Sequence, residues 1–569
     1  MIFLLRIALG NDIFLNYIAE SDVYVDKTLF IKDIIDSTIQ VSLITRPRRF
    51  GKTLNMTMLK AYFEKTNEDY SSISSVFSNL KISTCGEKYK KEMNKYAIIF
   101  MTLKEVKYST WEKCFSALKL KISEVFSYHK VILNSLDTYD QDFYYSILSG
   151  KADESDFASS IGKLIKWLGK YYKEKVILLI DEYDAPINEG YTRGYYDESI
   201  DFIKNLFGGA MKTNEGLKKA VLTGVTRIAG RSLFSEMNNF RSYNVLSEEY
   251  SEYFGFTEDE VKQVLEQCKV EHDFEEIKSW YNGYTFGKSI SIYNPWSIMN
   301  VAYEKNQRLA PHWTNTASNS ILKDHLANKS IETKESLYSL INGKSLKLPL
   351  RTEVTFNDLI KESDALWSFL LYAGYLTATN IREDFATFNI PNYEVKRELK
   401  TVIDLWLTEQ SGGISAVTMM LNAMLTGNQE LFTDKLSKFV HSSFSYFDTT
   451  GTEPELVYHA FILGLLVHLQ KDYYFNSNGE SGNGRADIMI MPLVGNYKTS
   501  AVILEFKKTR DIKKLDEVAQ TAINQIKEKR YIDEARKRGS KNIYIYGIGF
   551  YKKEIKVLME NFHNHELTK

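Results

Sequence analysis

The sequence predicts a multidomain α/β protein, and its length and hydrophobic pattern support this fold class. A chain of 569 residues is too long for one hydrophobic core. Short apolar runs alternate with amphipathic stretches at both ends of the chain, as in helices that flank a mainly parallel sheet. The pattern between them is mostly helical, and it is compatible with a winged-helix-like lid and connector. We therefore expect domains at residues 1–250, 251–450 and 451–569.

Composition narrows the class of protein without fixing its partners. Hydrophobic residues make up 44% of the chain and charged residues 25%, which is ordinary for a soluble globular protein. Residues 501–569 hold 16 Lys and Arg against 10 Asp and Glu, a local excess of six positive charges. This excess leaves room for a polyanionic partner, but a solvated helix face would give the same count.

Cysteine usage and the first residues predict a cytoplasmic protein. The three cysteines lie far apart and lack metal-site spacing, which favours a reducing compartment. The apolar opening MIFLLRIAL is interrupted by Arg6 and is shorter than the ~20 residues that a membrane span needs. It also lacks the features of a signal peptide. We expect no association with a membrane.

The clearest strands of the N-terminal region are short and apolar, as strands buried on both faces should be. They are VSLIT (41–45), YAIIFMTL (96–103), VILLID (176–181) and AVLTGVT (220–226).

A nucleotide site is predicted where the first of these strands passes through a tight loop into a helix. Gly51, Lys52 and Thr53 stand at the expected helix start, where backbone N–H groups and the helix dipole attract anions. Lys52 would reach the β- and γ-phosphates of ATP, and the Thr53 hydroxyl would ligate Mg²⁺. Arg46 stands where the general P-loop pattern has a glycine, so the motif alone is degenerate. A basic turn that caps a helix is the alternative.

A second motif supports the first. The strand VILLID ends in Asp181 and is followed by Glu182. Asp181 would hold Mg²⁺, and Glu182 would orient or deprotonate the attacking water. Ligand sites of parallel sheets lie at the carboxyl ends of the strands, where these acidic residues stand. A surface turn after a core strand is the alternative for this motif taken alone.

Four segments of the chain are distinctive when taken together: YVDKT (24–28), RPRRFGKT (46–53), LLIDEYDAPI (178–187) and LTGVTRIAGRSLFSEMNNF (222–240). They resemble the bacterial AAA-ATPase-like family, which typically carries a PD-(D/E)XK nuclease domain at its C-terminus. The similarity covers most of residues 10–300 and resumes near Pro454. The loop of this family is regularly RPRRFGK, so Arg46 is its usual form and is counted with the nucleotide-binding residues.

The resemblance also implies residues around the phosphates. Thr226 and Arg227 look like the sensor region of such ATPases, although Thr226 could be a plain buried threonine. The candidates for stabilising phosphate charge are Arg48, Arg49, Arg227 and Arg231. An arginine acting on a neighbouring subunit is left open, and homo-oligomerisation with it.

The C-terminal region contains a second set of charged residues with a shared logic. Asp487 follows a glycine-rich turn, and Glu505 and Lys507 alternate on one face of the strand VILEFKK. If the two strands are neighbours, Asp487 and Glu505 meet and form an oxygen-ligand site for Mg²⁺. Lys507 would then orient a water molecule or lower its pKa. An ordinary solvated strand edge gives the same short pattern.

The resemblance adds three residues to this site. Glu455, at the start of the preceding helix, resembles an additional acidic metal ligand of some members. Gln525 and Tyr531 match the family's helix after the catalytic strand. The order of these features favours an intact nuclease-type site.

The leading hypothesis is an ATPase coupled to a Mg²⁺-dependent nuclease that acts on nucleic acid, with DNA expected. The alternative is a nucleotide-switched signalling or scaffold protein whose C-terminal domain binds nucleic acid without cleaving it. An aromatic group in the middle region reads as core packing rather than base stacking. Its members are Trp280, Tyr284, Tyr293, Pro295 and Trp296.

Overall fold

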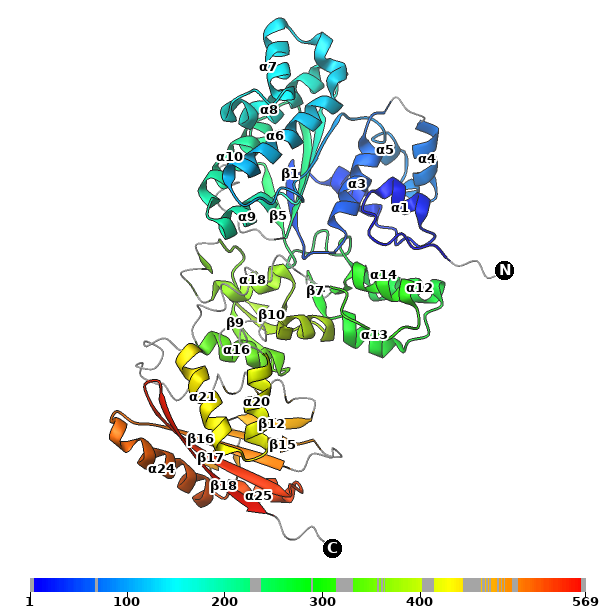
Figure 1. Cartoon of the computed structure of the whole chain (residues 1–569). Coiled ribbons are helices and arrows are strands. Elements are labelled where there is room, and N and C mark those ends of the chain that lie inside the picture. The colour runs from blue at the N-terminus through cyan, green and yellow to red at the C-terminus, as the bar shows by residue number, and fades with distance from the viewer. Residues whose placement is uncertain are drawn as a thin grey trace. The chain divides into compact units, whose positions relative to one another are not determined.

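The computed structural model forms two compact units, and each is described by itself (Figure 1). The first comprises Met1–Leu322 with Gly343–Leu399, and the second Lys323–Asn342 with Lys400–Lys569. The predicted multidomain α/β class is confirmed, whereas the domain boundaries near residues 250 and 450 stay predictions. The structure describes residues 5–66, 70–225, 237–287, 290–313, 331–355, 358–359, 362, 364–401, 414–443, 462, 466, 469, 472–477, 480–481, 484–485, 487–493 and 500–563.

The first unit is built on a five-stranded parallel sheet with the order β2-β3-β4-β1-β5. Its strands are β1 (Val41–Thr45), β2 (Ile98–Thr102), β3 (Val176–Asp181), β4 (Leu217–Gly224) and β5 (Phe240–Tyr243). The sequence predicted β1 and β3 with these bounds. β4 begins earlier than expected and ends at Gly224, and β5 was not predicted. Because the strands are parallel, their carboxyl ends meet at one edge of the sheet, where ligands bind in such folds.

Helices cover both faces of this sheet. Figure 1 shows α6 (Trp111–Tyr128), α8 (Glu154–Tyr172) and α10 (Tyr196–Met211) on one side, and α1 (Phe14–Glu20) and α3 (Lys52–Phe63) on the other. Because both faces of the sheet are covered, its central strands are mostly apolar, and every residue of β1 and β3 is buried.

The region after β5 contains two small antiparallel sheets besides its helices, so it is less helical than expected. The first sheet joins β6 (Phe256–Thr257), β7 (Tyr284–Phe286) and β8 (Ile290–Tyr293). The second joins β9 (Leu346–Pro349), β10 (Thr377–Arg382) and β11 (Phe385–Asn389).

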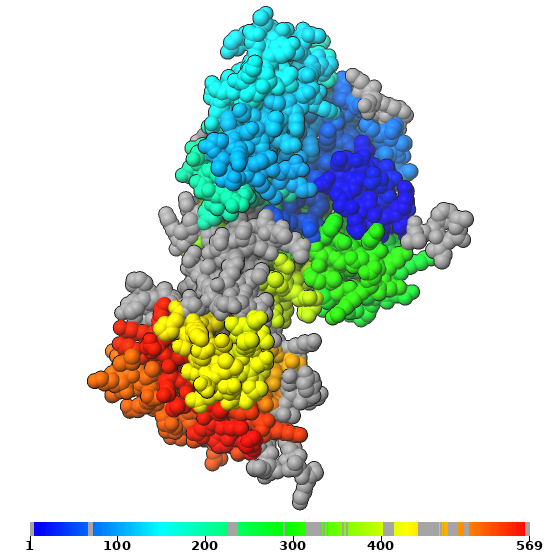
Figure 2. Space-filling model, viewed as in Figure 1, coloured from blue at the N-terminus to red at the C-terminus, as the bar shows by residue number. Residues whose placement is uncertain are grey.

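The helices of this region include α12 (Glu258–Cys268), α13 (Phe274–Tyr281), α14 (Pro295–Glu304) and the wholly buried α18 (Ala365–Ala373). The capping box of α12 is present, with the Thr257 and Glu260 side chains each bonded to the other's backbone. Val23 of the N-terminal segment packs into the same hydrophobic cluster as α12 and α14. Figure 2 shows the N-terminal residues, in dark blue, against the green surface of this region.

The second unit contains a mixed sheet with the order β12-β15-β16-β17-β18. Its strands are β12 (Tyr473–Ser477), β15 (Ile488–Pro492), β16 (Ser500–Lys508), β17 (Asn542–Tyr551) and β18 (Glu554–His563). β16 and β17 are parallel and the other pairs antiparallel.

Helices α20 (Ile414–Leu425), α21 (Gln429–Ser443), α24 (Leu515–Glu528) and α25 (Tyr531–Lys537) accompany this sheet. The single long helix expected after β16 is divided into α24 and α25, because Arg530 adopts a left-handed φ of 57°. The helix expected from residue 455 lies mostly outside the described residues.

The three cysteines are free thiols, and Cys114 and Cys268 are buried. Within the described parts of the chain, no helix combines the length and the apolar character needed to cross a bilayer.

The contact between α8 and α10 predicts opposite effects for two glycine substitutions. A Cβ at Gly162 would meet the carbonyl oxygen of Gly209, with the carbonyl carbon at 2.8 Å, whereas a Cβ at Gly208 would meet no atom within 4 Å. Gly162→Ala should therefore destabilise the chain by about 1–3 kcal/mol through overpacking. Gly208→Ala should be neutral or stabilise it by up to ~1 kcal/mol through helix propensity. Urea unfolding of both variants checks this, and equal losses would contradict the packing described.

Candidate functional sites

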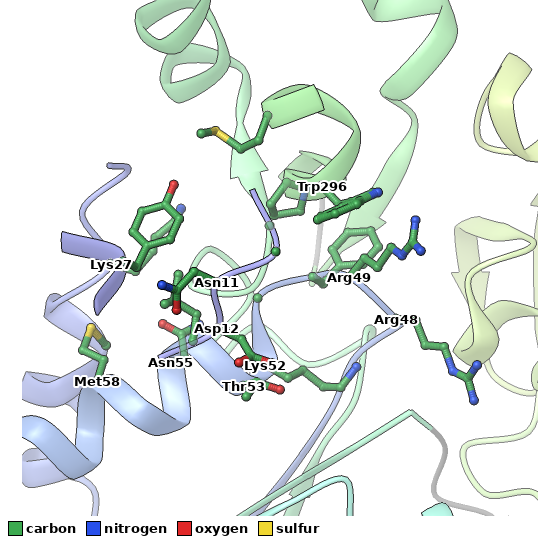
Figure 3. A pocket seen from close by; sticks show the side chains of 18 of the residues that line it. Asn11, Asp12, Lys27, Arg48, Arg49, Lys52, Thr53, Asn55, Met58 and Trp296 are labelled. Atoms are coloured by element: carbon green, nitrogen blue, oxygen red, sulfur yellow. The ribbon is translucent and has the colours of Figure 1, made fainter. Parts of the chain in front are cut away.

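The loop between β1 and α3 borders a cavity of about 510 Å³ (Figure 3). Gly51 is the N-cap of α3 and has a φ of 77°, which glycine adopts without strain. Lys52 and Thr53 begin the helix, and both line the cavity. The first N–H groups of a helix have no partner within it, so this end of the cavity suits an anion. The volume is in the range of small-molecule sites.

Lys52 is buried and folded back on the loop that precedes it. Its Nζ donates to the carbonyl oxygens of Arg46 at 3.1 Å and Pro47 at 2.9 Å. Burial lowers the pKa of the Lys52 ammonium, and the nearby Glu182 and Asp181 act in the opposite direction. The lysine is thus held beside the helix start with acidic residues close by.

Asp181 is the fully buried carboxylate at the end of β3. The Thr53 hydroxyl donates to its Oδ2 at 2.8 Å, and the Thr223 hydroxyl of β4 donates to its Oδ1 at 2.6 Å. Burial raises the pKa of the Asp181 carboxyl, against the effect of these hydrogen bonds. A buried carboxylate without a paired cation is costly, so Asp181 and the Thr53 hydroxyl fit a bound Mg²⁺.

Glu182 completes the polar side of the cavity. It lines the cavity and has a φ of 51°, a left-handed backbone that is uncommon for glutamate. Such strain is concentrated at functional sites. Other parts of the cavity are aromatic or apolar, with Tyr24, Tyr253 and Trp296 among the lining side chains. The cavity therefore combines an anion-binding end with surfaces that suit an aromatic base.

The second unit brings Asp487 and Glu505 together, as the sequence predicted for neighbouring strands. Ile488 pairs with Leu504 across β15 and β16, so Asp487 lies opposite Glu505. Asp487 Oδ2 accepts from the backbone N–H of Phe506 at 2.8 Å, and the Asp487 N–H donates to Glu505 Oε2 at 3.4 Å.

Glu505 is 1% exposed and is surrounded by polar groups. The Nζ of Lys507 lies 3.6 Å from Glu505 Oε1, and Gln525 of α24 donates to the same oxygen. Burial raises the pKa of Glu505 to about 7, and the charge of Asp487 adds to this effect. Two carboxylates this close together, one of them buried, fit a divalent cation. Among the described residues, no group of three or more metal-binding side chains occurs.

Comparisons with known proteins cover both sites. Residues 8–234 match the model of the AAA-ATPase-like family, described as a predicted AAA-ATPase. Residues 453–560 match the model of the PD-(D/E)XK nuclease superfamily. This chain joins an AAA-ATPase-like domain to a PD-(D/E)XK nuclease superfamily domain. The resemblance seen in the sequence is thereby confirmed for both ends.

A protein of Azotobacter chroococcum mcd 1, described as an uncharacterized protein in the vnfD 5′ region, is 25% identical over 546 residues. The match covers 93% of this chain and 92% of the relative. The similarity therefore extends through both domains and the region between them.

The side chain of Arg46 in the AAA-ATPase-like domain does not line the cavity, contrary to its expected place among the nucleotide-binding residues. It is fully buried and donates to the carbonyl oxygens of Thr45 and Tyr243. The rings of Phe254 and Phe286 lie 5.5 and 5.4 Å from the guanidinium carbon. Arg46 thus ties the nucleotide loop to the region after β5.

Arg48 and Arg49 line the cavity, and both also contact residues of α14 or of the segment that follows it. Arg49 lies over the Trp296 ring at 4.8 Å and donates to the His312 carbonyl oxygen. The indole N–H of Trp313 donates to the Arg48 carbonyl oxygen at 3.2 Å. The predicted roles of these two arginines at the phosphates remain predictions.

The Glu394 side chain, which no sequence pattern predicted, holds the segment that contains His312 and Trp313 in place. Its side chain accepts from the backbone N–H groups of His312 and Trp313 and from the Ser297 hydroxyl. The residue is fully buried. Burial raises the pKa of Glu394 to about 7, and the hydrogen bonds and the Arg49 charge oppose that rise. No local motif marks it, because its partners are about 80 to 100 residues earlier in the chain.

Several predicted site residues cannot be located. Thr226, Arg227, Arg231 and Glu455 lie outside the described residues. Thr223, not predicted, supplies a hydrogen bond to Asp181 from the neighbouring strand. Its position near the carboxyl end of a buried strand, beside the strand that ends in Asp181, could have indicated this role.

Glu394 predicts a pH-dependent stability. Because its pKa is raised from 4.5 to about 7, the folded chain keeps a proton that the unfolded chain releases. The resulting stability is complete below the unfolded pKa and is lost as the pH rises through the folded pKa. Between pH 5 and pH 8 the free energy of unfolding of the wild type should fall by up to about 3 kcal/mol more than that of Glu394→Gln. Denaturant unfolding at both pH values checks this, and parallel losses in the two proteins would contradict it.

Proposed function

We propose that the AAA-ATPase-like domain hydrolyses ATP with Mg²⁺ and that the PD-(D/E)XK domain cleaves nucleic acid, with DNA as the expected substrate. The observation that carries the first part is the hydrogen bond from Thr53 to Asp181, with Lys52 beside it at the start of α3. It unites the two nucleotide motifs at one sheet edge, as Mg²⁺-nucleotide binding requires.

The residues have separate tasks in ATP hydrolysis. The N–H groups of α3 and the Lys52 ammonium would hold the β- and γ-phosphates. Glu182 would orient a water molecule and accept its proton as the water oxygen bonds to the γ-phosphorus. The bond from that phosphorus to the bridging oxygen breaks, and its electron pair leaves on ADP. Mg²⁺, held by Thr53 and Asp181, would neutralise charge on the phosphate oxygens.

The PD-(D/E)XK site supports phosphodiester hydrolysis by the same logic. Asp487 and Glu505 would hold a divalent cation, which would stabilise charge that develops on the phosphate. Lys507, 3.6 Å from Glu505, would orient the water whose oxygen bonds to phosphorus. The P–O bond to the sugar oxygen would break with its electron pair left on that oxygen, which takes up a proton from solvent as the attacking water releases one. Gln525 fixes the position of Glu505 through its hydrogen bond.

A nucleotide-switched scaffold remains the second candidate. It is favoured by the contacts of Arg48 and Arg49 with Trp313 and Trp296, which connect the nucleotide loop to the region after β5. In this alternative ATP would change assembly, and the C-terminal domain would bind nucleic acid without cutting it. ATP-dependent change of oligomeric state without scission, measured by light scattering and gel assay, would favour it.

We also propose a cytoplasmic location, supported by the free thiols.

The ATPase proposal predicts different defects for two variants. Lys52→Ala should weaken ATP binding and reduce turnover by about 100-fold or more, because a phosphate-neutralising cation is lost. Glu182→Gln should bind ATP but reduce turnover to a similar extent, because the proton acceptor is lost. Phosphate release and binding of a fluorescent ATP analogue measure the two effects. Normal turnover in either purified variant would remove that residue from the mechanism.

The nuclease proposal predicts metal-dependent scission that fails in site variants. Asp487→Asn and Lys507→Ala should each lower the cleavage rate of DNA by at least about 100-fold, and chelation with EDTA should abolish it. Lys541→Ala, an exposed lysine in the same domain, is the matched control and should cleave normally. Undiminished cleavage by Asp487→Asn would show that the activity comes from elsewhere.

A further inference from the structure

Lys104 stands at the functional edge of the parallel sheet, although no motif includes it. It follows β2, the strand beside β3, and Thr102 of β2 is paired with Asp181. Lys104 therefore lies two residues beyond the position next to the buried carboxylate. It lines the same cavity as Lys52, Thr53 and Glu182.

The partner of Lys104 also belongs to the cavity. Its Nζ lies 3.0 Å from Asp12 Oδ2, and the two side chains are 52% and 44% exposed. Figure 3 shows Asp12 among the lining side chains, near Lys52 and Thr53. Exposed ion pairs of this kind contribute little free energy, so another anion can replace the carboxylate at small cost.

The Lys104 ammonium is close enough to Asp12, Glu182 and Asp181 for their negative charges to act on it. Burial acts to lower its pKa, but the hydrogen bond from Lys104 to Asp12 and the charges of Asp12, Glu182 and Asp181 outweigh this effect and raise it. The ammonium thus stays positive near the end of β3.

Three of the other cations that line the described cavity are held by stronger constraints. Lys27 is buried and bonded to both oxygens of Glu260. Lys52 is bonded to two loop carbonyls, and Arg49 is held by Trp296 and His312. Lys104 differs from these three because its recorded partner is one half-exposed carboxylate.

We infer that Lys104 is a catalytic residue that exchanges the Asp12 carboxylate for the γ-phosphate oxygens of ATP and stabilises their charge as the γ-phosphoryl group is transferred to water. This inference rests on the proposed ATPase function. The bonds that form and break are those of ATP hydrolysis, and Lys104 neither gains nor loses a proton. It supplies from within the chain a positive charge of the kind that other ATPases obtain from an arginine.

A comparison of ATP and ADP tests this role. Lys104→Ala should reduce turnover by about 100-fold or more and weaken ATP binding more than ADP binding, because only ATP carries the group it contacts. Lys104→Gln should behave alike and guards against a folding defect, which thermal unfolding would reveal. Lys113→Ala, an exposed lysine of α6, is the control and should retain wild-type turnover.

Asp12→Asn separates catalysis from a structural ion pair. If Lys104 acts on the phosphate, Asp12→Asn should lose far less turnover than Lys104→Ala. Equal losses in the two variants, or equal weakening of ATP and ADP in Lys104→Ala, would overturn the inference while leaving the ATPase function intact. If the wild-type chain neither binds nor hydrolyses ATP, the proposed function itself fails, and the inference with it.

Discussion

The buried carboxylate of Asp181 is the constraint around which the first unit is organised. Its charge is removed from water at the end of a strand that is covered on both faces. The hydroxyls of Thr53 in α3, Thr223 in β4 and Thr102 in β2 donate hydrogen bonds to it. These contacts require that β1, β3 and β4 run parallel and end at the same level. The position of α3, and so of its N–H groups, follows from the same arrangement.

The second unit also contains a buried carboxylate, which is held by different structural elements. Glu505 is as deeply buried as Asp181, but it lies within a strand and faces a second carboxylate. A lysine and a glutamine side chain both contact its Oε1 oxygen. In both units an acidic group is held in an apolar sheet where a divalent cation would relieve the cost of its charge. The chain thus has two sites suited to phosphate chemistry, each within its own sheet.

Much of this could be read from the sequence, for physical reasons that also set the limit. β1 and β3 are short, mainly apolar runs that end at polar residues, so their bounds and the nearness of Thr53 to Asp181 were predictable. The contact between Asp487 and Glu505 was predictable from their positions on two strands that were expected to be neighbours. β5 was missed because FRSY is short and polar. The division between α24 and α25 was missed because Arg530 has no preference for left-handed backbone. Glu394 and Lys104 depend on contacts between distant segments, which local patterns do not encode.

The enclosure of Arg46 has a consequence for dissecting the protein. The match to the AAA-ATPase-like family ends at residue 234, before Phe254 and Phe286, whose rings lie against the guanidinium. A fragment cut at that limit would keep the arginine and lose its aromatic enclosure, together with the Tyr243 carbonyl that accepts its hydrogen bond. A charged group would then be left in a partly opened apolar site next to the nucleotide loop. We therefore expect the smallest autonomous folding unit to extend beyond residue 234, because the segment after it encloses the Arg46 side chain.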